Sequence, residues 1–105
     1  NASHDRLTGL INMTELHERA VGVFAAAEAE GAQVVLALID LDHLKLVNDT
    51  LGHAVGDALI REAARRLLEA LGPHGHIARL GGDEFVFLGG ARHSHEAISE
   101  QMRLI

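Results

Sequence analysis

The chain has 105 residues, of which 48% are apolar and 23% charged, with one proline and no cysteine. This length allows a single domain with a real core, and the composition excludes a disordered chain, disulfide bridges and thiolate metal sites. A net charge of −6, a single lysine and three aromatic residues argue against binding to nucleic acid or to an anionic membrane surface, so a phosphorylated ligand would have to be held locally by a metal ion and one or two cations.

We treat residues 1–4 as a leader and residues 5–105 as one domain. Apolar residues recur at helical spacing from residue 14 to about residue 30, and Gly31 is placed to end that helix. Residues 34–39 are an unbroken run of β-branched and aliphatic side chains, which predicts a strand buried on both faces.

Residues 44–51 are long enough for two helical turns closed by Gly52, and residues 54–71 carry apolar side chains at the spacing of an amphipathic helix. Two short strand-like runs, residues 76–80 and 85–88, follow on either side of a glycine turn. Because glycine adopts positive φ without steric cost, these two runs predict a hairpin.

Ser94 is suited to cap a last helix, and residues 102–105 still read as mid-helix, so we expect further protein to follow. The predicted order, α-β-α-α-β-β-α, indicates an α+β sandwich with helices packed on a mixed central sheet. The longest apolar run is far shorter than the roughly 20 residues that cross a bilayer, and no signal peptide is visible. We therefore expect a cytoplasmic protein without direct membrane contact.

Acidic residues stand at two strand ends. Asp40 and Asp42 close the most apolar strand, and Asp83 and Glu84 lie in the glycine turn. If the hairpin lies beside the first strand, both pairs meet at one edge of the sheet, where hard carboxylate oxygens suit Mg²⁺. Each pair alone could be ordinary solvated turn acids, but two pairs adjoining buried strands favour a metal site.

Polar residues also surround the turn between the two middle helices. Asn48 and Asp57 could be capping or turn residues there. A carboxylate can alternatively accept from the two N–H donors on the Watson–Crick edge of guanine, and a carboxamide can complete that recognition. Lys45 precedes this turn and could reach a phosphate, or it could be a solvated surface lysine. No Walker A loop is present, and the eight histidines read mostly as exposed loop residues rather than a zinc site.

Three segments together resemble the GGDEF family. Residues 5–12 resemble its entry motif D-x-L-T-G-L-x-N, residues 40–57 resemble D-x-D-x-F-K-x-x-N-D-x-x-G-H-x-x-G-D, and residues 79–85 resemble its signature hairpin. Each motif is moderately specific, and their order and spacing make the combination very specific. The resemblance implies a ferredoxin-like, palm-type sheet related to nucleotide cyclases and polymerases, with the last strand and helix of the family missing.

The resemblance implies a diguanylate cyclase, which condenses two GTP into cyclic di-GMP and releases pyrophosphate. In that reading Asp40 and Asp83, helped by the carbonyl of Leu41, bind Mg²⁺ or Mn²⁺. Asp83 or Glu84 assists deprotonation of a ribose 3′-hydroxyl. Each domain holds one GTP, so catalysis needs a homodimer, and the native protein is expected to carry fused sensor or phosphodiesterase domains.

The resemblance also assigns the ligand-binding residues around the helical turn. Asn48 and Asp57 recognise guanine, while Lys45 and the backbone at Leu44 hold phosphate. Leu44 departs from the family, which usually has phenylalanine there. Gly72 and Gly75 stand where the inhibitory product site of the family carries arginine and aspartate, so no such site is expected.

Two other functions stay open at this stage. One is a catalytically inactive, GTP-binding regulatory domain of the same fold, and the other is a structural dimerisation module without nucleotide affinity. Because the family carries a lysine and an arginine near the phosphates beyond the end of this sequence, we expect the 105-residue chain itself to be a weak or inactive catalyst.

Overall fold

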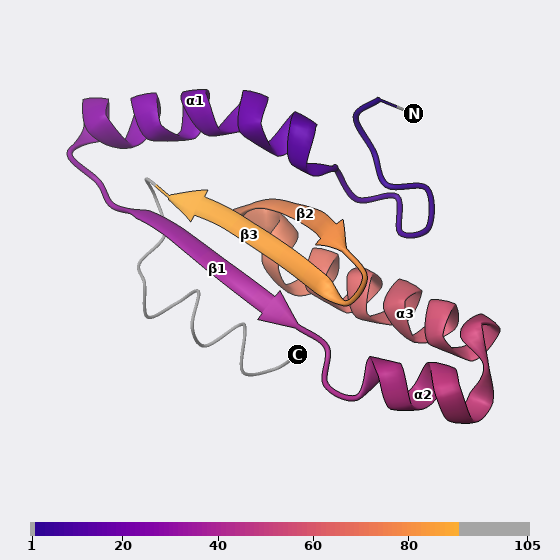
Figure 1. Cartoon of the computed structure of the whole chain (residues 1–105). Coiled ribbons are helices and arrows are strands. Elements are labelled where there is room, and N and C mark those ends of the chain that lie inside the picture. Colours follow the sequence, from indigo (N-terminus) through magenta and orange to yellow (C-terminus); the bar gives the residue numbers. More distant parts are fainter. Residues whose placement is uncertain (1, 91–105) are drawn as a thin grey trace.

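A computed structural model describes residues 2–90 of the chain. Every element predicted up to residue 90 is present, and the predicted last helix lies outside the described residues. The elements in chain order (Figure 1) are α1 (Met13–Glu30), β1 (Val34–Asp40), α2 (Leu44–Leu51), α3 (His53–Leu71), the short 3₁₀ helix η1 (Gly72–His74), β2 (Gly75–Gly81) and β3 (Glu84–Gly90). Within this part of the chain, no helix combines the length and the apolar character needed to span a bilayer.

The three strands form one sheet in the order β1-β3-β2. β3 pairs antiparallel with both neighbours, so β1 and β2 run in the same direction and are joined by the α2–α3 crossover. The sequence predicted a mixed sheet. Both ladders among residues 2–90 are instead antiparallel, because β3 lies between β1 and β2, so the two strands that run in the same direction do not pair with each other. One isolated parallel bridge joins Ile11 to Ala78.

Helices cover both faces of the sheet (Figure 1), which confirms the α+β sandwich. On one face, the fully buried rings of Phe85 and Phe87 pack with Leu67 and Leu71 of α3. On the other face, α1 packs over the hairpin, and its residue Leu16 belongs to the second cluster. That second cluster also contains the following buried residues: Ile11, Ala78, Val86 and Leu88.

β1 corrects one prediction, because only one of its faces packs against the core, and the side chains on that face are half-buried. Ala37 and Ile39 pack toward the core beneath α2 and α3, but the side chains of Leu36 and Leu38 on the opposite face are 70% and 67% exposed. On that face α1 covers β2 and β3, and it reaches β1 only near Val34. The apolar run therefore does not mean burial on both faces among the described residues.

Helix ends follow their sequence signals. The Asn12 side chain caps α1 by accepting from the Glu15 backbone N–H at 2.9 Å, and Gly31 ends the helix with a left-handed φ of 64°. Residues 2–4, expected to be a leader, lie against this cap, since the Asn12 backbone N–H donates to the Ser3 carbonyl at 2.9 Å. The domain bounds 5–105 stay a prediction.

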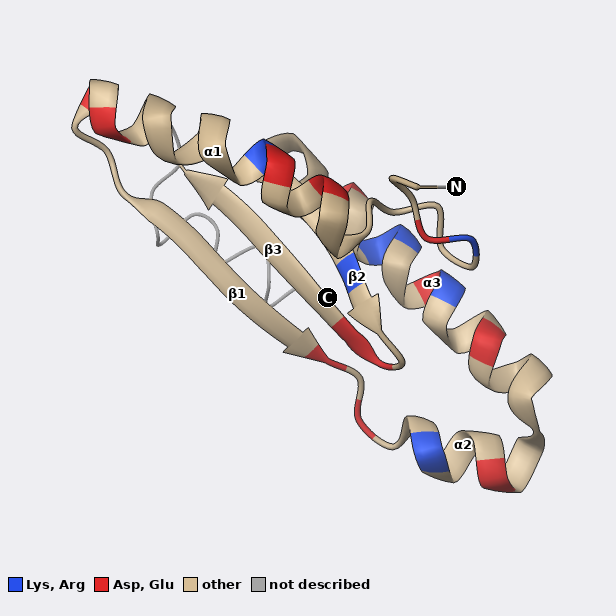
Figure 2. Cartoon of the chain, turned by 45° about the horizontal axis from the view of Figure 1, so that its top comes forward, with Lys and Arg blue, Asp and Glu red and all other residues tan. Residues whose placement is uncertain are grey.

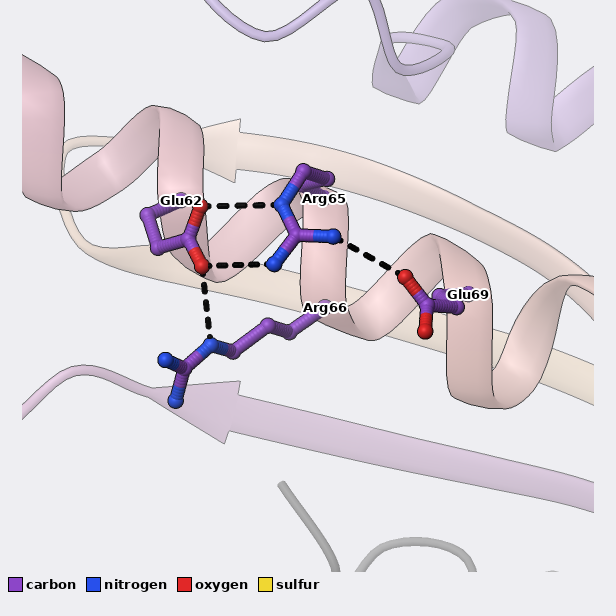
Figure 3. Close-up of polar contacts among 4 residues, drawn as sticks. All are labelled: Glu62, Arg65, Arg66 and Glu69. Atoms are coloured by element: carbon purple, nitrogen blue, oxygen red, sulfur yellow. Dashed lines mark hydrogen bonds and ion pairs between the residues drawn. The ribbon is translucent and has the colours of Figure 1, made fainter.

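The outer face of α3 carries a network of ion pairs one turn apart (Figure 3). Glu62 accepts from Arg65 at 2.7 Å and from Arg66 at 3.0 Å, and Arg65 also reaches Glu69 at 2.9 Å. Hydrogen bonds from the two arginines lower the pKa of Glu62 to about 2. These side chains are solvent-exposed, so they mark the polar face of an amphipathic helix rather than a binding site.

Candidate active site

The two acidic pairs predicted from the sequence meet at one edge of the sheet. Asp40 is the last residue of β1 and lies opposite Glu84, the first residue of β3, in the strand register. The backbone N–H of Leu41 donates to the carbonyl of Asp83 at 3.0 Å, which joins the end of β1 to the hairpin turn. Figure 2 shows the acidic end of β1 beside the acidic start of β3. The tertiary structure thus brings together acids that are about forty residues apart in the chain.

The surroundings at this edge change the pKa of the Asp40 carboxyl. Its pKa is raised, first by desolvation and then by the negative charge of Asp83, by a hydrogen bond with Asp83, and by the charge of Asp42. Two carboxylates that repel each other in this way are suited to binding a cation, because a bound cation would remove the repulsion. The donor set fits Mg²⁺, which takes one or two carboxylates and completes its shell with phosphate and water oxygens.

A glycine turn delivers Asp83 to this edge. Gly81 and Gly82 have φ values of 150° and 51°, which only glycine adopts without strain. The Gly82 carbonyl accepts a 2.9 Å hydrogen bond from Nη2 of Arg79. Arg79 lies on β2 at the residue where the β2–β3 register shifts, so a side chain from the strand holds the turn that carries the acid.

The predicted guanine-recognising residues flank the corner between α2 and α3. Asn48 lies on α2 and Asp57 on α3, with Gly52 at φ 92° between the helices. Neither helix start has a side-chain cap hydrogen bond, so neither residue serves there as a cap. Oδ1 of Asn48 is buried and has no hydrogen-bond partner among the described residues. Its carboxamide packs against the backbone of Gly56.

The two predicted phosphate-binding residues differ in what they can offer. The Leu44 side chain is only 7% exposed and packs in the core, so a ligand can use only its backbone. The Lys45 side chain is 90% exposed and makes a 2.8 Å ion pair with Asp49 on the same helix. Such an exposed pair contributes little stability, so the lysine can exchange this partner for a phosphate.

Of the histidines in the described part of the chain, His74 and His76 are half-buried and the others are exposed. His76 begins one of the predicted strand-like runs and lies half-buried on β2, where burial and then the charge of Arg19 lower its pKa. His74 is half-buried in η1, and His93 and His95 lie outside the described residues. Within residues 2–90, no group of three or more histidine, aspartate or glutamate side chains is arranged to hold a metal ion. The acidic edge therefore offers two carboxylates rather than a complete protein cage.

The positions of the family's inhibitory product site lie at the other end of the hairpin. A cavity of about 640 Å³ opens there between the C-terminal half of α1 and η1, and Gly72 and Gly75 line it. None of the residues assigned to metal, guanine or phosphate lines this cavity. A Cβ atom on Gly75 would collide with the Leu88 carbonyl oxygen and lie 2.7 Å from Cα of Gly89.

Comparisons with known proteins agree with this fold. The family model described as "Diguanylate cyclase, GGDEF domain" matches residues 2–105, and the chain belongs to the GGDEF family. The probable diguanylate cyclase DgcE of Escherichia coli is 43% identical over 88 residues, which are 84% of this chain and 8% of that protein. The cyclic di-GMP phosphodiesterase NbdA of Pseudomonas aeruginosa is 36% identical over 104 residues, covering 99% of this chain and 13% of that protein.

A solved structure shows the same architecture. The GGDEF domain of DgcB from Caulobacter crescentus, crystallised in complex with c-di-GMP, superposes with a TM-score of 0.89 at 33% identity. That match covers 99% of this chain and 60% of the crystallised chain. The chain therefore spans a small part of the two curated relatives and about three fifths of a solved domain.

Two structural relationships were missed by the sequence analysis. Asp5 and Arg79 belong to recognised motifs, but the motifs gave no role to either, and their contact spans 74 residues of chain. Gly56 also belongs to a motif, and nothing in its spacing indicated a contact with Asn48. A glycine inside an otherwise regular amphipathic helix was the one signal available, because glycine is unfavourable there.

Proposed function

We propose that this chain is part of the catalytic domain of a diguanylate cyclase, which condenses two GTP molecules into cyclic di-GMP and releases pyrophosphate. The observation that carries the proposal is the convergence of Asp40 and Asp83 at the sheet edge, with the pKa of Asp40 raised by desolvation and by Asp83. Crowded carboxylates of this kind suit a site that binds a divalent cation together with phosphate.

The residues of the site would have separate roles in the reaction. Asp40, Asp83 and the carbonyl of Leu41 would hold Mg²⁺ or Mn²⁺, which supplies Lewis-acid stabilisation of charge on the phosphates when bound. Asp83 or Glu84 would take the proton from the ribose 3′-hydroxyl. The 3′-oxygen of one GTP then forms a bond to the α-phosphorus of the other, and the bond from that phosphorus to the pyrophosphate oxygen breaks. A second, reciprocal transfer closes the ring.

Binding of the nucleotide would fall to the α2–α3 corner. Asn48 and Asp57 would recognise guanine, and the contact of the Asn48 carboxamide with Gly56 supports this, since it sets Asn48 against α3 next to the residue that precedes Asp57. Lys45 and the backbone at Leu44 would hold phosphate, at the start of a helix that lacks a side-chain cap. Each domain would carry one GTP, so the reaction would need a homodimer, in a cytoplasmic protein with fused sensor or phosphodiesterase domains.

The test compares this chain and the native protein that contains it in an assay for cyclic di-GMP formed from GTP with Mg²⁺. We expect product from the native protein, much less from the 105-residue chain, and none from the native Asp83→Asn variant. Asp42→Asn, which changes an exposed neighbour, is the matched control and should keep activity. Calorimetric titration with GTP and with ATP measures the base specificity. We expect the binding free energy to favour GTP over ATP by about 1–3 kcal/mol or more.

A second candidate is a GTP-binding regulatory domain without turnover. It is favoured by the 36% identity to NbdA, a protein named as a cyclic di-GMP phosphodiesterase. Selective GTP binding without product in the native protein would support this candidate. No nucleotide binding at all would instead support a structural dimerisation module.

A further inference from the structure

Gly56 is unusual for its position in the fold. It is buried inside α3, where glycine is a poor helix former compared with alanine. Its backbone does not explain the choice, because Gly56 is not among the glycines with positive φ in the described part of the chain. The reason for a glycine must therefore be space.

The space is used by one side chain. A Cβ atom on Gly56 would collide with Oδ1 of Asn48 and lie 2.8 Å from its Cγ, and the third close atom is Nδ2 of the same carboxamide at 3.5 Å. Gly75 differs, because its Cβ would meet backbone atoms of β3. The absence of a side chain at Gly56 thus leaves space for the Asn48 side chain, whereas at Gly75 it leaves space for a neighbouring strand's backbone.

This contact gives the fold no hydrogen bond in return. Oδ1 of Asn48 is buried and unpaired among residues 2–90, which is unfavourable, and the glycine weakens its helix. Two local costs at one contact, without a compensating interaction, are typical of a functional site. An alanine at this position would relieve one cost and force the carboxamide to turn away.

We propose that Gly56 is a positioning residue for guanine recognition, because its missing side chain lets the Asn48 carboxamide lie against α3 in the orientation that meets the base. The proposal rests on the function proposed above for Asn48. It extends the specificity determinants from the two side chains that would contact the base to a residue that would never touch it.

The test is the Gly56→Ala variant of the chain, with Gly22→Ala as the matched control. Both changes replace a helical glycine by alanine, but a Cβ on Gly22 meets no atom within 4 Å. Urea unfolding measures stability, and calorimetric titration with GTP and with ATP, in Mg²⁺, measures base preference. The Asn48→Ala variant and the Asn48→Ala/Gly56→Ala double variant complete a cycle.

We expect Gly56→Ala to unfold at the same or higher urea concentration as the unmodified chain, while its preference for GTP over ATP falls about tenfold or more. Gly22→Ala should raise the urea midpoint without changing the preference. In the Asn48→Ala background, Gly56→Ala should have no further effect on preference. The NMR resonances of the Asn48 side-chain amide should shift in Gly56→Ala and stay in place in Gly22→Ala.

Several results would overturn the proposal. One is an unchanged preference in Gly56→Ala while Asn48→Ala loses it, which would leave the role of Asn48 intact and remove only that of Gly56. Another is an unfolded Gly56→Ala chain, which would show that the contact supports the fold. An unchanged preference in Asn48→Ala, or no GTP binding by the unmodified chain, would instead remove the proposed role of Asn48, and that of Gly56 with it.

Discussion

Arg79 and Asp5 form a part-buried ion pair that joins the two ends of the described chain. Nη1 of Arg79 lies 3.1 Å from Oδ1 and 3.3 Å from Oδ2 of Asp5, and its Nη2 donates to the Gly82 carbonyl at 2.9 Å. The backbone N–H and the hydroxyl of Thr8 donate to the same carboxylate at 2.9 and 2.7 Å. The N-terminal turn around Asp5 thus fixes the position of Arg79, and Arg79 in turn supports the glycine turn that precedes Asp83.

Arg79→Ala should therefore destabilise the chain by about 1–3 kcal/mol, because it leaves the Asp5 carboxylate without its charged partner and the Gly82 carbonyl without its donor. Urea unfolding measures the loss. Arg66→Ala is the control, since Arg66 pairs with Glu62 on the exposed face of α3 and should change stability by less than about 1 kcal/mol. Equal effects of the two substitutions would contradict the structural role of Arg79.

The Asp5 carboxyl should make stability depend on pH. Burial acts to raise its pKa, but hydrogen bonds from Thr8 and Arg79 and the charge of Arg79 outweigh burial, so the pKa is lowered from its ordinary value of 3.8. A lowered folded-state pKa gives stability that is present above the unfolded-state value and is lost as the pH falls through the folded-state value. We expect the advantage of the unmodified chain over Asp5→Asn to be full at neutral pH and to shrink as the pH falls below about 4.

Urea unfolding of both proteins over this pH range measures that difference. Asp49→Asn serves as the control, because Asp49 pairs with Lys45 on the exposed face of α2. A constant difference between the unmodified chain and Asp5→Asn at all pH values would show that the carboxylate charge plays no part.

Mg²⁺ should stabilise the chain through Asp40 and Asp83. A ligand that binds only the folded state at about 100 times its Kd raises the free energy of unfolding by about 2.7 kcal/mol. Asp40→Asn should abolish this response, and without metal it should be no less stable than the unmodified chain, because it removes repulsion with Asp83. Thermal unfolding with and without MgCl₂ provides the measurement.

Asp42→Asn is the control for the metal response and should keep it, since Asp42 is exposed one residue beyond Leu41. A response that survives in Asp40→Asn and disappears in Asp42→Asn would move the cation site away from the sheet edge.

Gly75→Ala should destabilise the hairpin by about 1–3 kcal/mol, because its Cβ meets the backbone of Leu88 and Gly89, which cannot yield as a side chain can. Gly72→Ala should be tolerated, since Gly72 has helical φ and ψ and its Cβ meets only the end of the Leu68 side chain at 3.2 Å. An aspartate at residue 75 is excluded by the same collision, so we expect cyclic di-GMP not to bind at these two glycines. Urea unfolding of both variants and a titration with cyclic di-GMP check these expectations.

The sequence alone was sufficient to predict the order of the α-helices and strands up to residue 90 and most of their bounds, but it did not predict the short 3₁₀ helix η1. Helical spacing in residues 14–30, the apolar run at residues 34–39 and the glycines of the hairpin turn are local signals, each set by backbone preference and side-chain periodicity. The same signals placed two pairs of acidic residues at strand ends. Because the hairpin lies beside β1, both pairs then lie at the same edge of the sheet.

Only the tertiary structure determined which surfaces and which distant side chains meet. Periodicity cannot tell that α1 leaves Leu36 and Leu38 of β1 exposed, because that depends on where a helix crosses the sheet. Nor can spacing reveal that Arg79 reaches Asp5 or that Asn48 lies against Gly56, since these contacts form between separate elements after packing. Local preferences specify the elements, whereas burial and shape, summed over the whole fold, specify their contacts.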